Sequence, residues 1–157
     1  MLNELWAKVS AREKFIVYGS AVAVVGWLAG TILGSKSYGG GSVAGIAIPG
    51  VTVNYFSWGN AGLFDILALL AALATLVVVY LKVAPNMNIT WPMPVGQILL
   101  GLTVVAAVCG VLALLMQFTS NLSDPPILMY VADVLVIGGA GFAAYNAYLE
   151  YQAGLVK

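Results

Sequence analysis

Two acidic residues lie within long apolar stretches of this sequence, and their side chains are the ones best suited to chemistry. Asp65 falls in the segment GLFDILALL and Asp133 in the segment ILMYVADVLVIGG. A carboxylate in a bilayer is costly unless it is paired, protonated or hydrated, so one hypothesis is a proton or cation site shared by both acids. The other hypothesis is structural: Asp65 caps the start of a helix, where the macrodipole favours negative charge, and Asp133 hydrogen-bonds a neighbouring helix. Further contacts to a shared site are expected from Thr31, Asn54, Asn60 or Tyr130.

Most other chemistry is missing from the composition. Histidine is absent and Cys109 is the only cysteine. An intrachain disulfide, a CxxC pair and a cysteine-rich metal site are therefore excluded, and the commonest metal and haem ligand is lacking. Serines such as Ser20 have no neighbouring base to activate them. We therefore expect no metal site and no cofactor, and we expect that the protein is not an enzyme.

A glycine stripe is the most specific motif in the chain. Gly26, Gly30 and Gly34 form a GxxxGxxxG pattern in the first apolar run. This spacing lets another helix approach closely enough for van der Waals packing to drive association. The partner is either a helix of the same bundle or a helix of a second copy or another subunit. Further close-approach surfaces are expected at Gly138, Gly139 and Gly141.

The elements that must position these residues are predicted from the composition. Hydrophobic residues make up 62% of the 157 positions and charged residues 8%, against roughly 25% charged residues in a soluble domain. Four apolar runs, at residues 14–34, 62–81, 95–118 and 127–149, are near the roughly 20 residues that a membrane-spanning helix needs. They lack the alternation of barrel strands. We predict an all-α integral membrane protein, a four-helix transmembrane bundle that forms a single domain, residues 1–157.

The segments around these runs predict two smaller elements. Apolar residues at helical spacing within residues 1–14 predict a short helix that lies in the membrane interface. Ser10 and Glu13 fit a capping box that opens the first span. Residues 35–60 are rich in glycine and in β-favouring side chains around the turn signal Pro49-Gly50. We expect an ordered loop there, such as a small β-hairpin, rather than a flexible linker.

The distribution of positive charge predicts the orientation in the membrane. Five basic residues are expected on one side of the bilayer: Lys8, Arg12, Lys14, Lys82 and Lys157. The opposite side holds only Lys36. Because cytoplasmic segments are enriched in Lys and Arg, the amino and carboxyl termini are both predicted to be cytoplasmic. The basic residues form no stripe that follows a nucleic-acid backbone, so nucleic acid is not an expected partner.

These observations favour a structural role. We expect a small accessory or assembly subunit whose glycine-lined helices pack against copies of itself or against other subunits, with the ordered first loop as a docking element. The alternative is a small oligomeric ion or proton channel or transporter in which Asp65 and Asp133 line the path. The expected partners are therefore the lipid bilayer and other membrane subunits or further copies of the chain.

Overall fold

The computed structural model describes residues 2–33, 35–43, 45–54, 62–84, 89–119 and 127–155. Gly34 and Asn60 lie outside these ranges. The described chain is mostly helical, and four short strands stand between the first two of its long helices.

Four long helices form the body of the protein and confirm the predicted bundle. They are α2 (Ala11–Leu33), α3 (Leu63–Val83), α4 (Val95–Thr119) and α5 (Ile127–Leu155). Each is long and apolar enough to cross a bilayer, which makes this a multi-pass membrane protein. The last helix extends beyond the predicted span of residues 127–149, because Glu150 and the residues after it continue α5 to Leu155.

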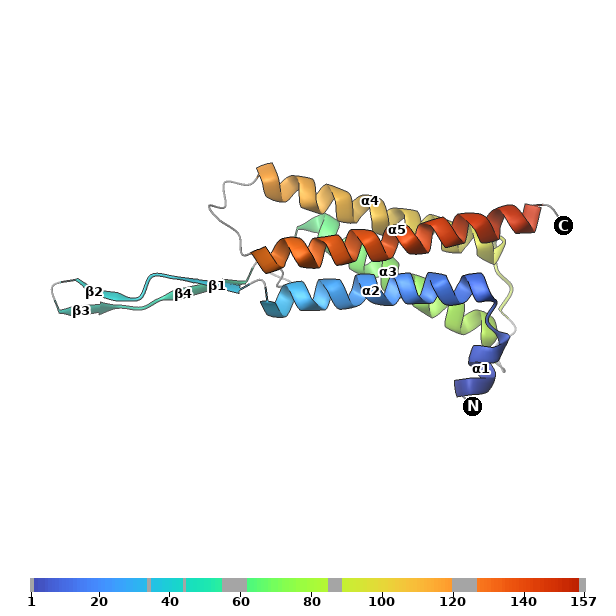
Figure 1. Cartoon of the computed structure of the whole chain (residues 1–157), viewed down its shortest axis with the longest axis horizontal. Helices are drawn as coiled ribbons and strands as arrows, with labels where there is room; N and C mark the ends of the chain where they lie inside the picture. Colours follow the sequence, from blue (N-terminus) through green and yellow to red (C-terminus); the bar gives the residue numbers. More distant parts are fainter. Residues whose placement is uncertain are drawn as a thin grey trace.

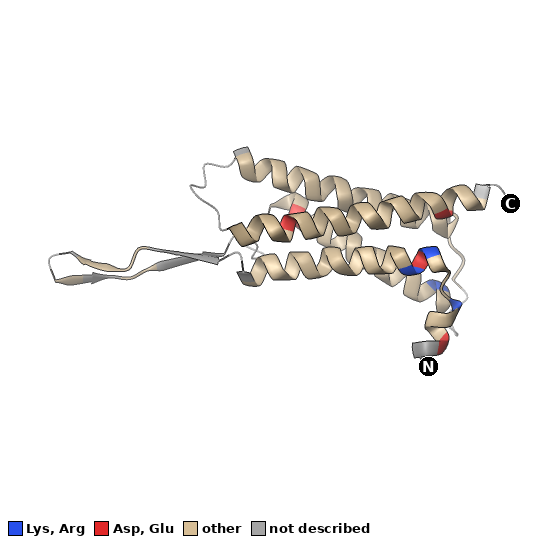
Figure 2. Ribbon diagram, in the orientation of Figure 1, with Lys and Arg blue, Asp and Glu red and all other residues tan. Residues whose placement is uncertain are grey.

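The helices pack as a closed bundle in which each long helix contacts two neighbours. Both α3 and α5 contact α2, and both also contact α4, with consecutive helices running in opposite directions (Figure 1). A layer of small buried side chains lies near the middle of the helices and consists of Ala23, Ala71, Ala72, Ala106 and Ala140. Small residues let helices approach closely. This alanine layer separates the charged residues, which gather at the two ends of the bundle (Figure 2).

A short helix, α1 (Leu2–Lys8), precedes the bundle, as the sequence predicts. Trp6 and Val9 pack into an apolar cluster that includes Ile16 of α2, so this segment is attached to the end of the bundle. The predicted capping box is confirmed. The Ser10 backbone N–H donates to Glu13 Oε2 at 3.0 Å, and the Glu13 N–H donates to Ser10 Oγ at 3.1 Å. These two bonds fix where α2 begins.

The glycine-rich loop forms a long two-stranded β-hairpin that projects beyond the helices (Figure 1). Strand β1 (Ser35–Tyr38) pairs with β4 (Val51–Asn54), and β2 (Gly41–Val43) pairs with β3 (Ile46–Ile48), both antiparallel.

The chain reverses near Gly45, which has φ +80°, rather than at the turn signal Pro49-Gly50. A left-handed conformation is available to glycine without strain, so Gly45 suits the tip. Pro49 has no N–H for a strand ladder, and the Pro49-Gly50 pair lies between the two ladders. There a Cβ on Gly50 would be 3.0 Å from the carbonyl oxygen of Gly39.

Candidate functional site

Asp133 is buried inside the bundle at the end that carries the hairpin. It lies near the second turn of α5, and its exposed fraction is 3%. The Gln117 side chain on α4 donates Nε2–H to Asp133 Oδ1 at 3.4 Å. Within the described residues the other carboxylate oxygen, Oδ2, is buried without a hydrogen-bond partner. An ionised carboxylate in such a place lacks compensation for its lost hydration, so Asp133 is suited to hold a proton.

Asp65 lies in the first turn of α3, at the end of the bundle where α5 begins and where Asp133 lies near its second turn (Figure 1). Its Oδ2 accepts a hydrogen bond from the backbone N–H of Gly62 at 3.1 Å, which caps the helix. The structure therefore places the two acids at the same end of the bundle, and Asp65 makes the capping contact that the structural alternative predicts.

The surroundings of Asp133 are largely apolar. The cluster at this end of the bundle consists of Trp27, Ala68, Leu69, Cys109, Met129 and Val136. Among the expected contributors, the Thr31 hydroxyl donates to the Leu28 carbonyl of its own helix at 2.6 Å. The Tyr130 ring stacks on Phe118 with centroids 5.8 Å apart. The side chain of Asn54 and the whole of Asn60 lie outside the described residues.

Two of the predicted packing glycines lie in the contact between α2 and α5. A Cβ on Gly26 would lie 2.7 Å from the Leu135 Cβ. A Cβ on Gly139 would lie 2.6 Å from the carbonyl oxygen of Gly19 and 2.7 Å from the backbone nitrogen of Ala23. At these positions the glycines bring the two helices of one bundle together.

The other predicted glycines are placed differently. Gly30 is buried on α2, and Gly34 lies outside the described residues. A Cβ on Gly138 or Gly141 would meet no atom within 4 Å. Gly138 also lines a shallow apolar groove between α2 and α5, together with Tyr18. Bare backbone is therefore available on the outer surface of α5.

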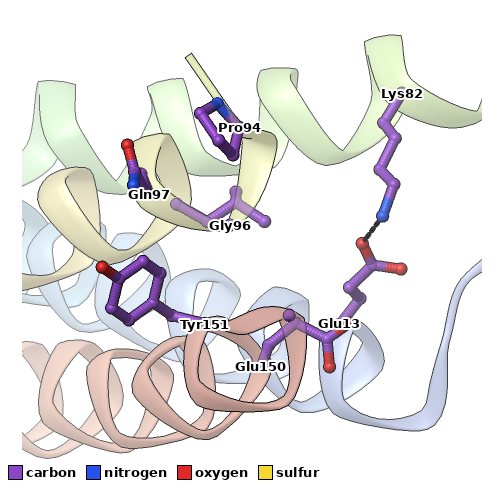
Figure 3. Close-up of a pocket in the computed structure, with 9 residues that line it drawn as sticks. Glu13, Lys82, Pro94, Gly96, Gln97, Glu150 and Tyr151 are labelled. Atoms are coloured by element: carbon purple, nitrogen blue, oxygen red, sulfur yellow. Dashed lines mark hydrogen bonds and ion pairs between the residues drawn. The ribbon is translucent and has the colours of Figure 1, made fainter. Parts of the chain in front are cut away.

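A second polar cluster lies at the opposite end of the bundle, where the chain begins and ends. Glu13 on α2 and Lys82 on α3 form an ion pair in which their side chains are 3% and 41% exposed, respectively. A pocket of about 220 Å³ opens beside this pair (Figure 3). The first turn of α4 and the last turns of α5 complete its wall, with Pro94, Gly96, Gln97, Leu99, Glu150, Tyr151 and Gly154.

Sequence reasoning missed this ion pair and the packing role of Gly19. The sequence does indicate that the two residues could meet. The capping box places Glu13 at the start of the first span, and the predicted topology places Lys82 on the same side of the bilayer. The predicted span ends at residue 81, but α3 continues through Val83, so Lys82 lies in the last turn of the helix. For Gly19, its seven-residue distance from Gly26 was the available indication.

In the part of the chain that the structure describes, no group of three or more Cys, Asp or Glu side chains is placed to hold a metal ion. No family model, curated protein or solved structure matches this chain. A function must therefore be inferred from its own hairpin and its two polar clusters.

Proposed function

We propose that this chain is a small accessory or assembly subunit of a membrane complex, in which the helical bundle is the anchor and the hairpin is a docking arm. The projecting hairpin is the observation that supports this role most directly. Among the described strands, each pairs with just one other. The hairpin extends past the helices (Figure 1), and Ile46 next to its tip is 72% exposed.

A two-stranded ribbon is marginally stable in water when nothing packs on it. Its outer edges also present backbone N–H and C=O groups that are available to another strand. Proteins use such edges to bind an extended segment of a partner, with main-chain hydrogen bonds supplying the affinity. A hairpin held away from its own bundle is therefore suited to bind another subunit outside the bilayer.

The interior of the bundle supports an anchoring role. The alanine layer and the close contacts of Gly26 and Gly139 bring the helices together across the middle of the bundle. The buried hydroxyls of Thr75 and Thr103 donate to carbonyl groups of their own helices, at 2.9 Å and 2.8 Å. These polar groups are satisfied where they lie, and they require no substrate.

We further propose that the termini face the cytoplasm and the arm faces the other side. Both termini lie at the end of the bundle opposite the hairpin (Figure 1). Lys8, Arg12, Lys14 and Lys82 belong to this terminal end, and the cytoplasmic ends of membrane helices are enriched in such residues. A protease added to sealed vesicles of known orientation tests the assignment by cutting either a terminal tag or the hairpin.

The test of the subunit role is to replace residues 36–53 with a short Gly-Ser linker. The complex is extracted in a mild detergent and weighed by native mass spectrometry. We expect the bundle to keep its helical circular dichroism and the bound partner to be lost. A point variant, Ile46→Asp, should weaken the partner without altering the bundle. Retention of the same partner in the same ratio after the replacement would exclude the arm as the docking element.

A second candidate function is an oligomeric ion or proton conduit, and Asp133 is the observation that favours it. One oxygen of its buried carboxyl group has no hydrogen-bond partner among the described residues, and Asp65 lies at the same end of the bundle. The matched test is proton and cation flux in proteoliposomes with Asp133→Asn and Asp65→Asn. Flux that is lost in the first variant supports the conduit, and the absence of flux in the unaltered protein at any lipid ratio argues against it.

A further inference from the structure

The pocket beside the Glu13–Lys82 ion pair has the size and position of a site for the polar part of a lipid. Its volume of about 220 Å³ is below the range of about 300–1,000 Å³ that is usual for drug-sized ligands. All four long helices contribute to its lining, with Glu13 from α2, Lys82 from α3, Gly96 from α4 and Tyr151 from α5 (Figure 3). Each contribution comes from the first or last turns of its helix. The pocket therefore lies where the bundle meets the bilayer surface.

One side of the pocket is suited to a phosphate group. The Lys82 ammonium carries three N–H donors, and its side chain remains 41% exposed while it pairs with Glu13. The first turn of α4 also lines the pocket. The Gln97 and Ile98 N–H groups donate to the Pro94 carbonyl oxygen at 2.9 Å and 3.3 Å, so Val95 and Gly96 carry the N–H groups that a helix start leaves without a partner in the helix. Gly96 has no side chain to cover them. An ammonium and an uncovered helix start together attract a phosphate.

The charge balance of the pocket indicates that the ligand also carries a positive group. Its lining holds one lysine and two glutamates, Glu13 and Glu150. Glu13 is already paired with Lys82, so Glu150 is the carboxylate of the lining that can accept from a cation on the ligand. The lining alone therefore carries one carboxylate more than its single ammonium, and the nearby Arg12, which is not part of the lining, donates to the Leu149 carbonyl oxygen at 2.8 Å. A primary ammonium beside the phosphate removes the mismatch and supplies N–H donors.

We propose that this pocket binds a phosphate–ammonium zwitterion, the phosphoethanolamine headgroup of a membrane phospholipid. The phosphate lies against Lys82 and the first turn of α4, and the primary ammonium lies against Glu150. Glu13 is a positioning residue, because its capping contacts with Ser10 hold the carboxylate that orients Lys82.

The lipid is favoured over soluble phosphoethanolamine by the surroundings of the pocket. Part of the lining is apolar, including Pro94 and Leu99, which suits the glycerol part of a lipid. Near the pocket, α5 also carries the exposed side chain of Tyr148, at 46% exposure. Acyl chains pack on such surfaces, whereas a soluble headgroup gains nothing from them.

The test uses nanodiscs made of equal parts phosphatidylethanolamine, phosphatidylglycerol and phosphatidylcholine with matched acyl chains. The full chain is released into a mild detergent, and the lipids that remain bound are counted by native mass spectrometry. Choline lacks N–H donors and glycerol lacks the cation, so retention of phosphatidylethanolamine should exceed that of the other two by about tenfold, the effect of one charge-assisted hydrogen bond.

Two variants leave the ion pair intact. Glu150→Gln should reduce the preference for phosphatidylethanolamine over phosphatidylcholine by about tenfold. Gly96→Leu should abolish retention by filling the pocket, since a Cβ at Gly96 meets only the Tyr151 Cα at an ordinary 3.8 Å. The matched control is Gly101→Leu on the same helix, where a Cβ meets nothing within 4 Å. This control should retain lipid like the unaltered chain.

Equal retention of the three lipids, or equal loss in Gly96→Leu and Gly101→Leu, would overturn the proposal. A separate titration with soluble phosphoethanolamine distinguishes the two sources of the headgroup. Competition at micromolar concentration without selective lipid retention would assign the pocket to a soluble ligand and overturn the lipid assignment. Selective lipid retention with no such competition supports it.

Discussion

A methyl group added at Gly139 is expected to force α2 and α5 apart, and the adjacent Gly138 supplies a matched control. The Cβ of an alanine at position 139 would lie 2.6 Å from the carbonyl oxygen of Gly19 and 2.7 Å from the nitrogen of Ala23. Both are backbone atoms, so no side-chain rotation relieves the overlap. Ordinary van der Waals contact of a Cβ begins near 3.4 Å, against 2.6 Å to the Gly19 carbonyl oxygen. The two helices must therefore separate by about 0.8 Å at this point.

The size of the effect follows from this displacement. Overpacking of a close contact costs about 1–3 kcal/mol, and the glycine-to-alanine change itself contributes up to about 1 kcal/mol in favour of the helix. At Gly138 the Cβ would meet no atom within 4 Å, so only the favourable contribution remains. We expect Gly138→Ala to be about 1–3 kcal/mol more stable than Gly139→Ala.

The assay is reversible unfolding in mixed micelles with increasing dodecyl sulfate, followed by far-ultraviolet circular dichroism. The Gly19→Ala variant supplies an internal check, since its Cβ would lie 2.6 Å from the Gly139 carbonyl oxygen across the same contact. One separation of the helices relieves both overlaps, so the double variant should lose less than the sum of the two single losses. Equal free energies of unfolding for Gly138→Ala and Gly139→Ala would refute the close backbone contact.

Three further predictions concern the polar residues. Lys82→Met leaves Glu13 buried without its partner and should lower the free energy of unfolding by about 3 kcal/mol, and adding Glu13→Gln should recover most of that loss in the same titration. Ser10→Ala removes the capping oxygen and should lower that free energy by about 1 kcal/mol, and an unchanged value would show that this cap does not stabilise α2. Dicyclohexylcarbodiimide, which labels protonated carboxyl groups in apolar sites, should add its mass to the unaltered chain and to Asp65→Asn but not to Asp133→Asn; labelling of Asp133→Asn would show that the reactive acid lies elsewhere.

Features that depend on neighbouring residues were predictable from the sequence. The four spans follow from the length of apolar runs, because the bilayer requires backbone groups to be paired within each segment. The capping box follows from Ser10 and Glu13, since its bonds join residues three apart. The hairpin was predicted by composition, but its tip was not. A Pro-Gly pair marks a place where the hydrogen bonds between two strands are interrupted. Such an interruption occurs at a turn, but it also occurs between two successive strand pairs, so the sequence does not tell these two cases apart.

Features that depend on how distant segments meet were not predictable. The ion pair between Glu13 and Lys82 joins residues 69 positions apart, and its formation depends on which faces of α2 and α3 meet. The glycines illustrate the same limit. Gly138 and Gly139 are adjacent, yet one faces outward and the other faces the backbone of α2. In a helix that is apolar on all sides, hydrophobic periodicity does not indicate which face is buried.

The positions of the charged residues bear on the choice between the two candidate functions. Asp133 and Asp65 lie at one end of the bundle and the Glu13–Lys82 pair at the other, with the alanine layer between them. A proton held at Asp133 meets small apolar side chains on its way through a single bundle, where an uncompensated charge is costly. Conduction therefore requires a path between copies of the chain rather than through one copy. An accessory subunit requires no such path, and the same separation of charges suits it, because each end is then free to contact a different partner.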